Sequence, residues 1–144
     1  MQLGFAMLEV GSVRKAQRTT VLAKNVLDST VSMLGFWVFC SWRGSQLVSE
    51  SDGKMQSHLM FFQSAFCGTA VTICGGSMAE RAHMHAYLFF ATLMSLLIYP
   101  EIAEGAWTQN AMLSSQFQLP TGYRYHDFAG SGVVHLTGGC CALI

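Results

Sequence analysis

The chain has 144 residues, of which 51% are hydrophobic and only 11% are charged, whereas soluble domains carry about 25% charged residues. Eight Lys and Arg balance eight Asp and Glu, which argues against a basic surface for nucleic acid. The composition favours a membrane protein with the lipid bilayer as its solvent, with room for roughly four or five helices of about 20 residues each.

The first apolar segment, MQLGFAMLEVG, is too short to span a bilayer and resembles the end of a helix whose beginning is missing. A polar, basic connector follows at 11–18. The second segment, Thr19–Cys40, is predicted to be a span. It carries Lys24, Asn25 and Asp28 near its start, and polar groups at membrane depth are costly. We therefore expect these residues to be buried against protein or kept near the interface.

Residues 41–57 are polar and predict an exposed loop. The third span, His58–Ala79, contains no Asp, Glu, Lys or Arg and ends before Glu80. A fourth, shorter span begins at Ala86; Tyr99-Pro100 predicts a stop or a kink near Ile98, and the apolar segment reaches Ala103.

Residues 101–126 mix acids, amides and aromatic residues and are interpreted as a long loop with interfacial aromatic residues. The last segment starts at Asp127 and is still apolar at Ile144. We expect both ends of the chain to be truncated, which leaves three complete spans between two incomplete ones. The fold class is therefore all-α, a polytopic transmembrane helical bundle.

Basic residues predict the orientation of the spans. The connector at 11–18 and the turn at 80–85 carry four Arg and Lys residues together, and the two longer loops carry three. Because short basic loops weigh most in the positive-inside rule, the two turns are predicted to face the cytoplasm and the longer loops to face outside.

The last segment contains two polar residues that are candidates for a functional site. Asp127 has a structural role available as the N-cap of the helix that follows it. His135 lies in an otherwise apolar helix, where an ionisable ring must line a cavity or find a partner; an interhelical hydrogen bond is the simpler alternative. The glycines in Gly130-Ser-Gly-Val-Val-His135 imitate a dinucleotide-binding fingerprint, but close helix packing explains them better.

Aromatic residues form a second group. Phe62 and Phe66 lie at i and i+4 on one face of the third span, and Trp107 is expected on the same outer side. Such a stripe is usually core or lipid contact. If it converges with the helix that bears His135, it would form a vestibule in which the rings bind a small cation, at about 0.5–2 kcal/mol for each ring.

No metal site, cofactor or disulfide framework is predicted. The five cysteines form no CxxC pair and are interpreted as apolar packing residues. His83 and His85 supply only two ligands in a solvated turn, which is too few for a metal site. The chain is not expected to be an enzyme, and the uncharged third span makes a soluble nucleotide-dependent oxidoreductase a poor alternative.

Five segments carry a family signature: MQLGFAMLEVGSVR, LAKNVLD, FFQSAF, GGSMAER and DFAGSGVVHLTGG. In this order they resemble the ammonium transporter family (Amt/Mep/Rh) over nearly the whole chain. The resemblance implies the first half of an inverted-repeat fold of two five-helix halves, with residues 1–144 as a partial ammonium transporter domain. It also implies a homotrimer in a membrane, expected to be the plasma membrane.

Site roles also follow from the resemblance. Phe66 resembles the outer phenylalanine that helps bind ammonium and forms half of an aromatic gate. Trp107 resembles the tryptophan of the outer recruitment site, and His135 the first of two pore histidines. Asp127 resembles the aspartate that orders the outer site, and Phe62 belongs to the same substrate-binding group.

The implied function is passage of ammonium or ammonia through a hydrophobic pore that contains histidine. The alternative is a non-conducting scaffold, subunit or sensor. The chain departs from the family pattern at Glu104, where a His or similar residue is usual, and its loop 108–126 is longer than is common. The second pore histidine, the second gate phenylalanine and an outer-site serine belong to the other half.

Overall fold

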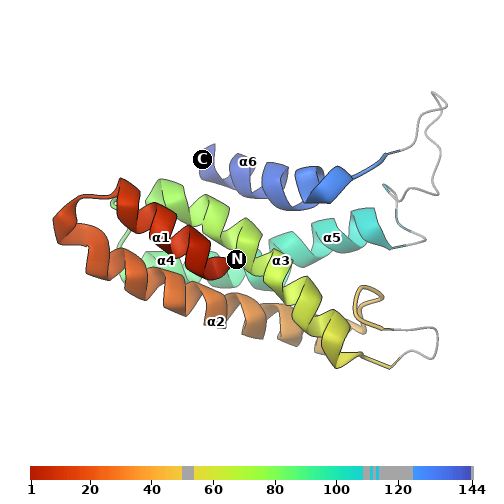
Figure 1. The fold of residues 1–144 in the computed structure, drawn as a ribbon. Helices are drawn as coiled ribbons and strands as arrows, with labels where there is room; N and C mark the ends of the chain where they lie inside the picture. Colours follow the sequence, from red (N-terminus) through yellow and green to blue (C-terminus); the bar gives the residue numbers. More distant parts are fainter. Residues whose placement is uncertain (50–53, 109–110, 112, 114–124, 144) are drawn as a thin grey trace.

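The computed structural model describes residues 1–49, 54–108, 111, 113 and 125–143. Every named element in this part of the chain is helical, which confirms the all-α prediction. The long helices pack side by side as a bundle (Figure 1). In chain order the α-helices are α1 (Gln2–Ser12), α2 (Arg18–Arg43), α3 (Ser57–Met78), α4 (Met84–Leu93), α5 (Tyr99–Trp107) and α6 (Thr137–Leu143).

Four short turns complete the helical elements. A 3-10 turn, η1 (Lys15–Gln17), joins α1 to α2, and a π-helical turn, η2 (Met94–Ile98), lies between α4 and α5. A 3-10 turn, η3 (Phe128–Gly130), and a π-helical turn, η4 (Ser131–Leu136), lead into α6. As a result, 84–107 forms one long helix, and 128–143 forms a shorter apolar one.

Two helices in the described residues are long and apolar enough to cross a membrane: Ser57–Met78 and Met84–Trp107. The first agrees with the predicted span His58–Ala79 to within one residue at each end. The predicted segment Thr19–Cys40 is helical within α2, whose 26 residues exceed the length a span needs. Because α2 carries polar residues, it is not one of the two helices that are apolar enough to cross a membrane. That α2 crosses a bilayer therefore stays a prediction.

The sequence-based boundary at Pro100 is wrong. The helix does not stop near Ile98; it continues through Pro100 to Trp107, so 101–107 is helix and not loop. In the π-turn η2 the backbone N–H of Tyr99 bonds to the carbonyl of Met94, five residues back. This widening accommodates a proline, which has no N–H to donate and whose ring clashes with the carbonyl four residues earlier.

The connections gather at two opposite ends of the bundle. The turn between α1 and α2 and the turn between α3 and α4 lie at one end, and the longer connections lie at the other (Figure 1). Arg14 pairs with Glu80 across the two short turns, at 3.2 Å, and Arg43 pairs with Glu101 at the other end. The two basic turns therefore share one side as predicted, whereas their cytoplasmic location stays a prediction.

The polar residues of α2 point into the bundle. Lys24, Asn25 and Asp28 are all buried, which agrees with the expectation that they pack against protein. Asp28 Oδ2 accepts a 2.6 Å hydrogen bond from the Thr72 hydroxyl on α3, and Asn25 donates a 2.7 Å bond to Glu9 on α1. These hydrogen bonds join α1, α2 and α3 through paired polar groups.

The apolar core lies between α2, α3 and the helix 84–107, with Phe36 and Tyr99 in ring contact at 6.2 Å. Cys40, Cys67 and Cys74 are free and buried, as packing residues should be, whereas Cys140 is exposed. α6 covers α3 at Gly138, where a Cβ would come within 2.8 Å of the Ala70 carbonyl. Gly138 therefore allows close helix packing, whereas a Cβ at Gly130 or Gly132 would meet Val134 or Tyr125 and not another helix.

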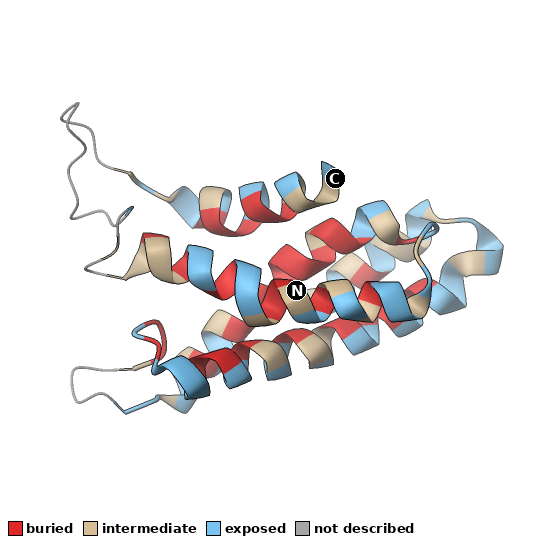
Figure 2. Cartoon of the chain, turned by 180° about the vertical axis from the view of Figure 1, so that it is seen from behind, coloured by how far each residue is buried: buried red, intermediate tan, exposed pale blue. Residues whose placement is uncertain are grey.

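The outward faces of the helices are exposed and the inward faces are buried (Figure 2). Large apolar side chains are numerous on the exposed faces: Leu3 on α1, Phe61 on α3 and Phe89 on α4 are each more than 60% exposed. Faces of this kind need contact with lipid or with further protein. The arrangement fits a segment of a helical membrane protein.

Candidate functional site

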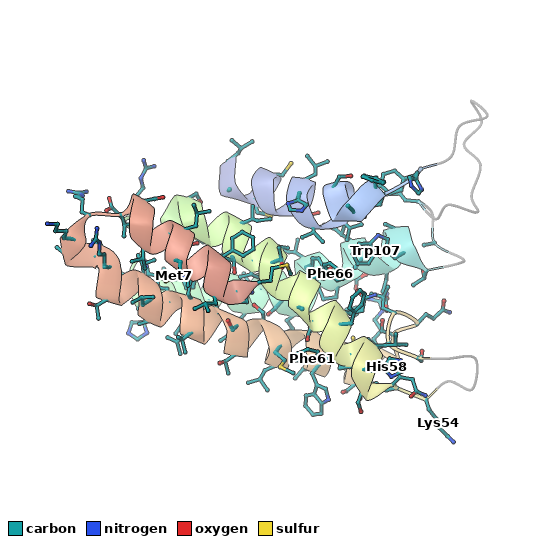
Figure 3. All side chains as sticks on the ribbon, in the orientation of Figure 1. Met7, Lys54, His58, Phe61, Phe66 and Trp107 are labelled. Atoms are coloured by element: carbon teal, nitrogen blue, oxygen red, sulfur yellow. The ribbon has the colours of Figure 1, made fainter. Side chains whose placement is uncertain are left out.

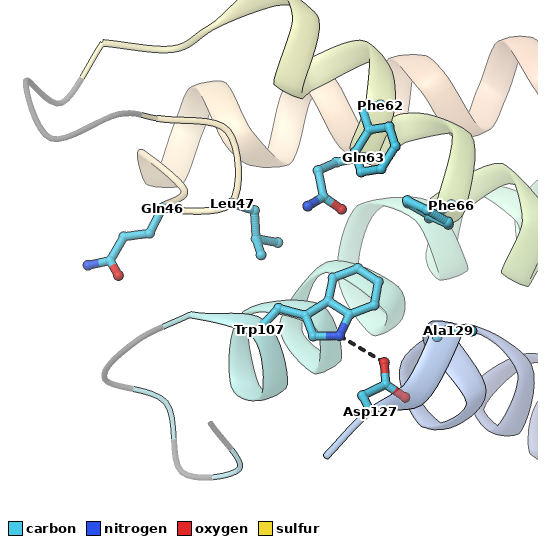
Figure 4. Close-up of a pocket in the computed structure, with 9 residues that line it drawn as sticks. Gln46, Leu47, Phe62, Gln63, Phe66, Trp107, Asp127 and Ala129 are labelled. Atoms are coloured by element: carbon cyan, nitrogen blue, oxygen red, sulfur yellow. Dashed lines mark hydrogen bonds between the residues drawn. The ribbon is translucent and has the colours of Figure 1, made fainter. Parts of the chain in front are cut away.

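The site is built around a contact between the end of α5 and the start of η3. Trp107 is the last residue of α5, and Asp127 immediately precedes η3. The indole Nε1 of Trp107 donates a 2.8 Å hydrogen bond to Oδ2 of Asp127 (Figure 4). Because the indole N–H has this partner, the orientation of the ring is fixed.

Asp127 has several further partners. Its Oδ1 accepts hydrogen bonds from the backbone N–H of Gly132 at 2.6 Å and from the Ser131 hydroxyl at 3.4 Å. The Tyr125 hydroxyl also bonds to this carboxylate. Burial, together with the neighbouring Asp127 charge, raises the pKa of Tyr125, which keeps its hydroxyl protonated as a donor.

The predicted N-cap role of Asp127 is not found at the turn that it precedes, because its side chain makes no capping hydrogen bond to η3. The carboxylate does accept a backbone N–H, but from Gly132, beyond the first turn, because the chain does not enter the helix directly. Ala129 and Gly130 have φ values of 54° and 72°, and regular right-handed backbone begins only at Ser131. A left-handed alanine is strained, and such strain is often found at functional sites.

Three aromatic rings converge next to this contact. Phe62 and Phe66 on α3 meet edge to face with their centroids 4.9 Å apart, and Phe66 meets Trp107 at 5.9 Å. Figure 3 shows Phe66 and Trp107 on the same side of α3, with Phe61 directed away from them. The α3 stripe therefore converges with Trp107, and α3 and α5 both contribute rings to the cluster.

These side chains line a cavity of about 590 Å³ at the end of the bundle that carries the longer connections. Its lining residues come from the 44–56 connector, α3, α5 and the entry to the last helix: Gln46, Leu47, Phe62, Gln63, Phe66, Trp107, Asp127, Ala129 and Gly130. Four of the five predicted site residues, all except His135, are thus brought together at one cavity.

His135 lies apart from this cavity. It is exposed on η4, and its imidazole makes no hydrogen bond with the residues that the structure describes. The interhelical hydrogen bond considered from the sequence is therefore not made within these residues. Glu104 does not line the cavity either. Of the unusually long loop at 108–126, residues 109–110, 112 and 114–124 lie outside the described residues.

Sequence reasoning missed three polar contributors to the site, which are Gln46, Gln63 and Tyr125. Gln63 stands between the two predicted phenylalanines, and its Oε1 is buried without a hydrogen-bond partner. A lone amide within an uncharged span was a usable signal, because a buried amide is expected to have a purpose. Tyr125 was interpreted only as an interfacial aromatic residue, since nothing in the sequence indicated its contact with Asp127.

The described residues contain no cluster of three or more His, Cys, Asp or Glu side chains that could hold a metal ion. The chemistry available at the cavity is therefore that of aromatic faces, one hydrogen-bonded carboxylate and amide groups. Aromatic faces attract cations through their negative electrostatic potential. The combination fits a small cation that can also donate hydrogen bonds.

Comparisons with known proteins agree with this chemistry. The model of the Ammonium Transporter Family matches residues 1–144. Ammonium transporter Amt2 of Archaeoglobus fulgidus is 39% identical over 99% of the chain, which corresponds to 34% of that protein. Ammonium transporter 1 member 3 of Solanum lycopersicum is 36% identical over 96% of the chain, or 33% of that protein.

The chain thus spans about a third of the length of these curated relatives. Both relatives are named as transporters and not as enzymes. No solved structure matches the chain. The alignments cover nearly the whole chain, and so include the helices that build the cavity.

Proposed function

The chain belongs to the ammonium transporter family, and from this premise we propose that the protein containing it moves ammonium across a membrane. The 144 residues would supply the outer binding site and part of the pore. The observation that carries the proposal is the cavity in which Phe66 and Trp107 meet beside the Asp127 carboxylate.

In the proposed binding step, an ammonium ion enters the cavity from the end of the longer connections. The rings of Phe66 and Trp107 attract its charge at about 0.5–2 kcal/mol each. Asp127 acts through Trp107: it fixes the indole and adds a negative charge behind it. The hydrogen bonds it already accepts favour a supporting role for this carboxylate over direct capture of the ion.

In the proposed transfer step, the ion gives up a proton, and neutral ammonia crosses the apolar section of the pore. Moving an unpaired cation through hydrocarbon would cost far more than moving a neutral molecule. His135 would offer a hydrogen bond to ammonia and take part in a proton relay, an ordinary role for histidine. Potassium would be rejected because it has no proton to release.

His135 is exposed on its own helix, which supports a pore that is completed by additional protein on that side. We propose that a second half of the same protein provides this cover, and that the protein is a multi-pass homotrimer of the plasma membrane with 11–18 and 80–85 in the cytoplasm. The exposed apolar faces of α1, α3 and α4 are available for lipid and for such contacts.

The proposal is tested by radiolabelled methylammonium uptake in cells that lack their own ammonium transporters. We expect the complete reading frame to give saturable uptake that ammonium competes away. Uptake at background level, with the protein present in the membrane, would refute the conducting function. That result would favour the alternative of a scaffold or sensor.

A further inference from the structure

One polar group at the cavity is left unexplained by the proposed binding step. Gln63 lies on α3 between Phe62 and Phe66, and its side chain extends toward the space beside Trp107 (Figure 4). The carbonyl oxygen Oε1 is buried and has no hydrogen-bond partner. Buried carbonyl oxygens in native proteins are almost always paired, so an unpaired one at a cavity indicates a partner that enters from outside.

The Asp127 carboxylate and the Trp107 indole N–H at the cavity are already engaged. The Asp127 carboxylate accepts hydrogen bonds from Trp107, Gly132 and Ser131, and the indole N–H is used in the first of these. Two further buried polar atoms in the described residues lack partners, Asn25 Oδ1 and the Tyr99 hydroxyl, but neither residue lines this cavity. Among the lining residues that the structure describes, Gln63 Oε1 is therefore the buried side-chain acceptor that lacks a hydrogen-bond partner.

Aromatic rings and a carbonyl oxygen recognise different properties of a cation. A ring attracts any small cation by its charge. A carbonyl oxygen accepts a hydrogen bond from an N–H that approaches in a preferred direction. Ammonium has N–H groups to donate, and potassium has none. Potassium also needs several oxygens to replace its hydration shell, and among the described lining residues only one buried side-chain carbonyl lacks a partner.

We propose that Gln63 Oε1 accepts a hydrogen bond from the ammonium ion in this cavity and thereby favours ammonium over potassium at the binding step. This inference rests on the proposed function and adds a second means of recognition. The rings of Phe66 and Trp107 attract the positive charge, Asp127 positions the indole, and Gln63 accepts a hydrogen bond from the N–H group. Selection of ammonium over potassium then begins at the binding step, before the ion loses its proton.

The test uses the complete protein and radiolabelled methylammonium, with potassium as a competitor. Gln63→Leu and Gln63→Met remove the acceptor and keep a side chain of similar length, whereas Gln63→Glu retains an acceptor. We expect the first two to raise the half-saturating methylammonium concentration about ten- to a hundredfold, as for a lost hydrogen bond to a charged group. Potassium should compete more effectively in these variants. Gln63→Glu should keep the half-saturating concentration at or below the wild-type value.

Gln17→Leu is the matched control, because it removes the same amide at η1, at the opposite end of the bundle. If neither the wild type nor this control takes up methylammonium, the proposed function itself fails. If both transport, and the Gln63 variants without an acceptor do so with unchanged half-saturation and potassium competition, only the inference about Gln63 is overturned. Failure of both of those variants to reach the membrane would assign the amide to folding and would also overturn the inference.

Discussion

The indole nitrogen of Trp107 and the carboxylate of Asp127 lie 2.8 Å apart, although 20 residues separate them in the chain. The bond joins the last residue of α5 to the residue that precedes η3. The carboxylate also accepts the Gly132 N–H at 2.6 Å. One side chain therefore fixes both the aromatic ring of the cavity and the backbone that leads into the last helix.

A double-mutant cycle tests whether this bond supports cation binding. Trp107→Phe keeps an aromatic face but loses the N–H, and Asp127→Asn loses the charge. We expect each variant to raise the half-saturating methylammonium concentration about tenfold or more, since hydrogen bonds to charged groups contribute about 1.5–3 kcal/mol. The double variant should be little worse than the poorer single one. Fully additive effects would show that the two residues act independently.

A second prediction concerns Lys24, whose ammonium group is buried at the carboxyl end of α3. It donates hydrogen bonds to the carbonyls of Met78 at 3.3 Å, Ala79 at 3.0 Å and Ala82 at 2.8 Å. The positive charge also complements the negative end of the α3 dipole. Lys24→Met should lower the free energy of unfolding by about 2–4 kcal/mol, because three acceptors lose a charged donor.

The measurement is thermal unfolding of the purified complete protein in detergent. Lys15→Met is the matched control, because Lys15 is exposed in η1 and its loss should leave the melting temperature unchanged. Equal melting temperatures of the Lys24 variant and the wild type would mean that water donates hydrogen bonds to the three carbonyls as well as the lysine does.

Much of the architecture could be predicted from the sequence. The third span was located to within one residue at each end, because an uncharged run between polar loops has one plausible solution in a bilayer. The pairing of Phe62 with Phe66 followed from helical spacing. The structure shows that these rings meet Trp107, whereas their placement at the outer side of a membrane stays a prediction.

Other features depended on backbone geometry that the sequence does not display. Proline usually ends or kinks a helix, but the π-turn η2 accommodates Pro100 and carries the helix on to Trp107. A left-handed conformation at Ala129 has no residue signature, because alanine normally avoids it. His135 was expected beside the aromatic rings, and in this chain it lies apart from the cavity they line.

The ion pair between Arg14 and Glu80 gives a prediction about pH. Hydrogen bonds from the Arg14 backbone and guanidinium group lower the pKa of Glu80 from its ordinary value of 4.5. A lowered folded-state pKa means that the contribution to stability is present above the unfolded-state value and is lost as pH falls through the folded-state value. Glu80→Gln should therefore melt slightly below the wild type near neutral pH and equally with it in acid.

The expected difference is small, because Arg14 is largely exposed and surface ion pairs are screened by water and salt. Thermal unfolding at low and high salt provides the control, since high salt should reduce the neutral-pH difference. A difference that persists unchanged in acid would mean that Glu80 contributes through packing and not through its charge.

The last prediction separates the two roles considered for His135. If it belongs to the proton relay of the proposed pore, then His135→Ala and His135→Gln should both lower methylammonium uptake by about tenfold or more, because neither replacement side chain ionises. General acid and base groups typically contribute at least about a hundredfold to proton transfer. If it only makes a hydrogen bond to another helix, the amide of His135→Gln should restore uptake while His135→Ala does not. His85→Ala, in the first turn of α4, is the matched control and should transport as the wild type does. Unchanged flux and unchanged selectivity against potassium in both His135 variants would remove this residue from the pore, while leaving the aromatic cavity as a binding site that operates without it.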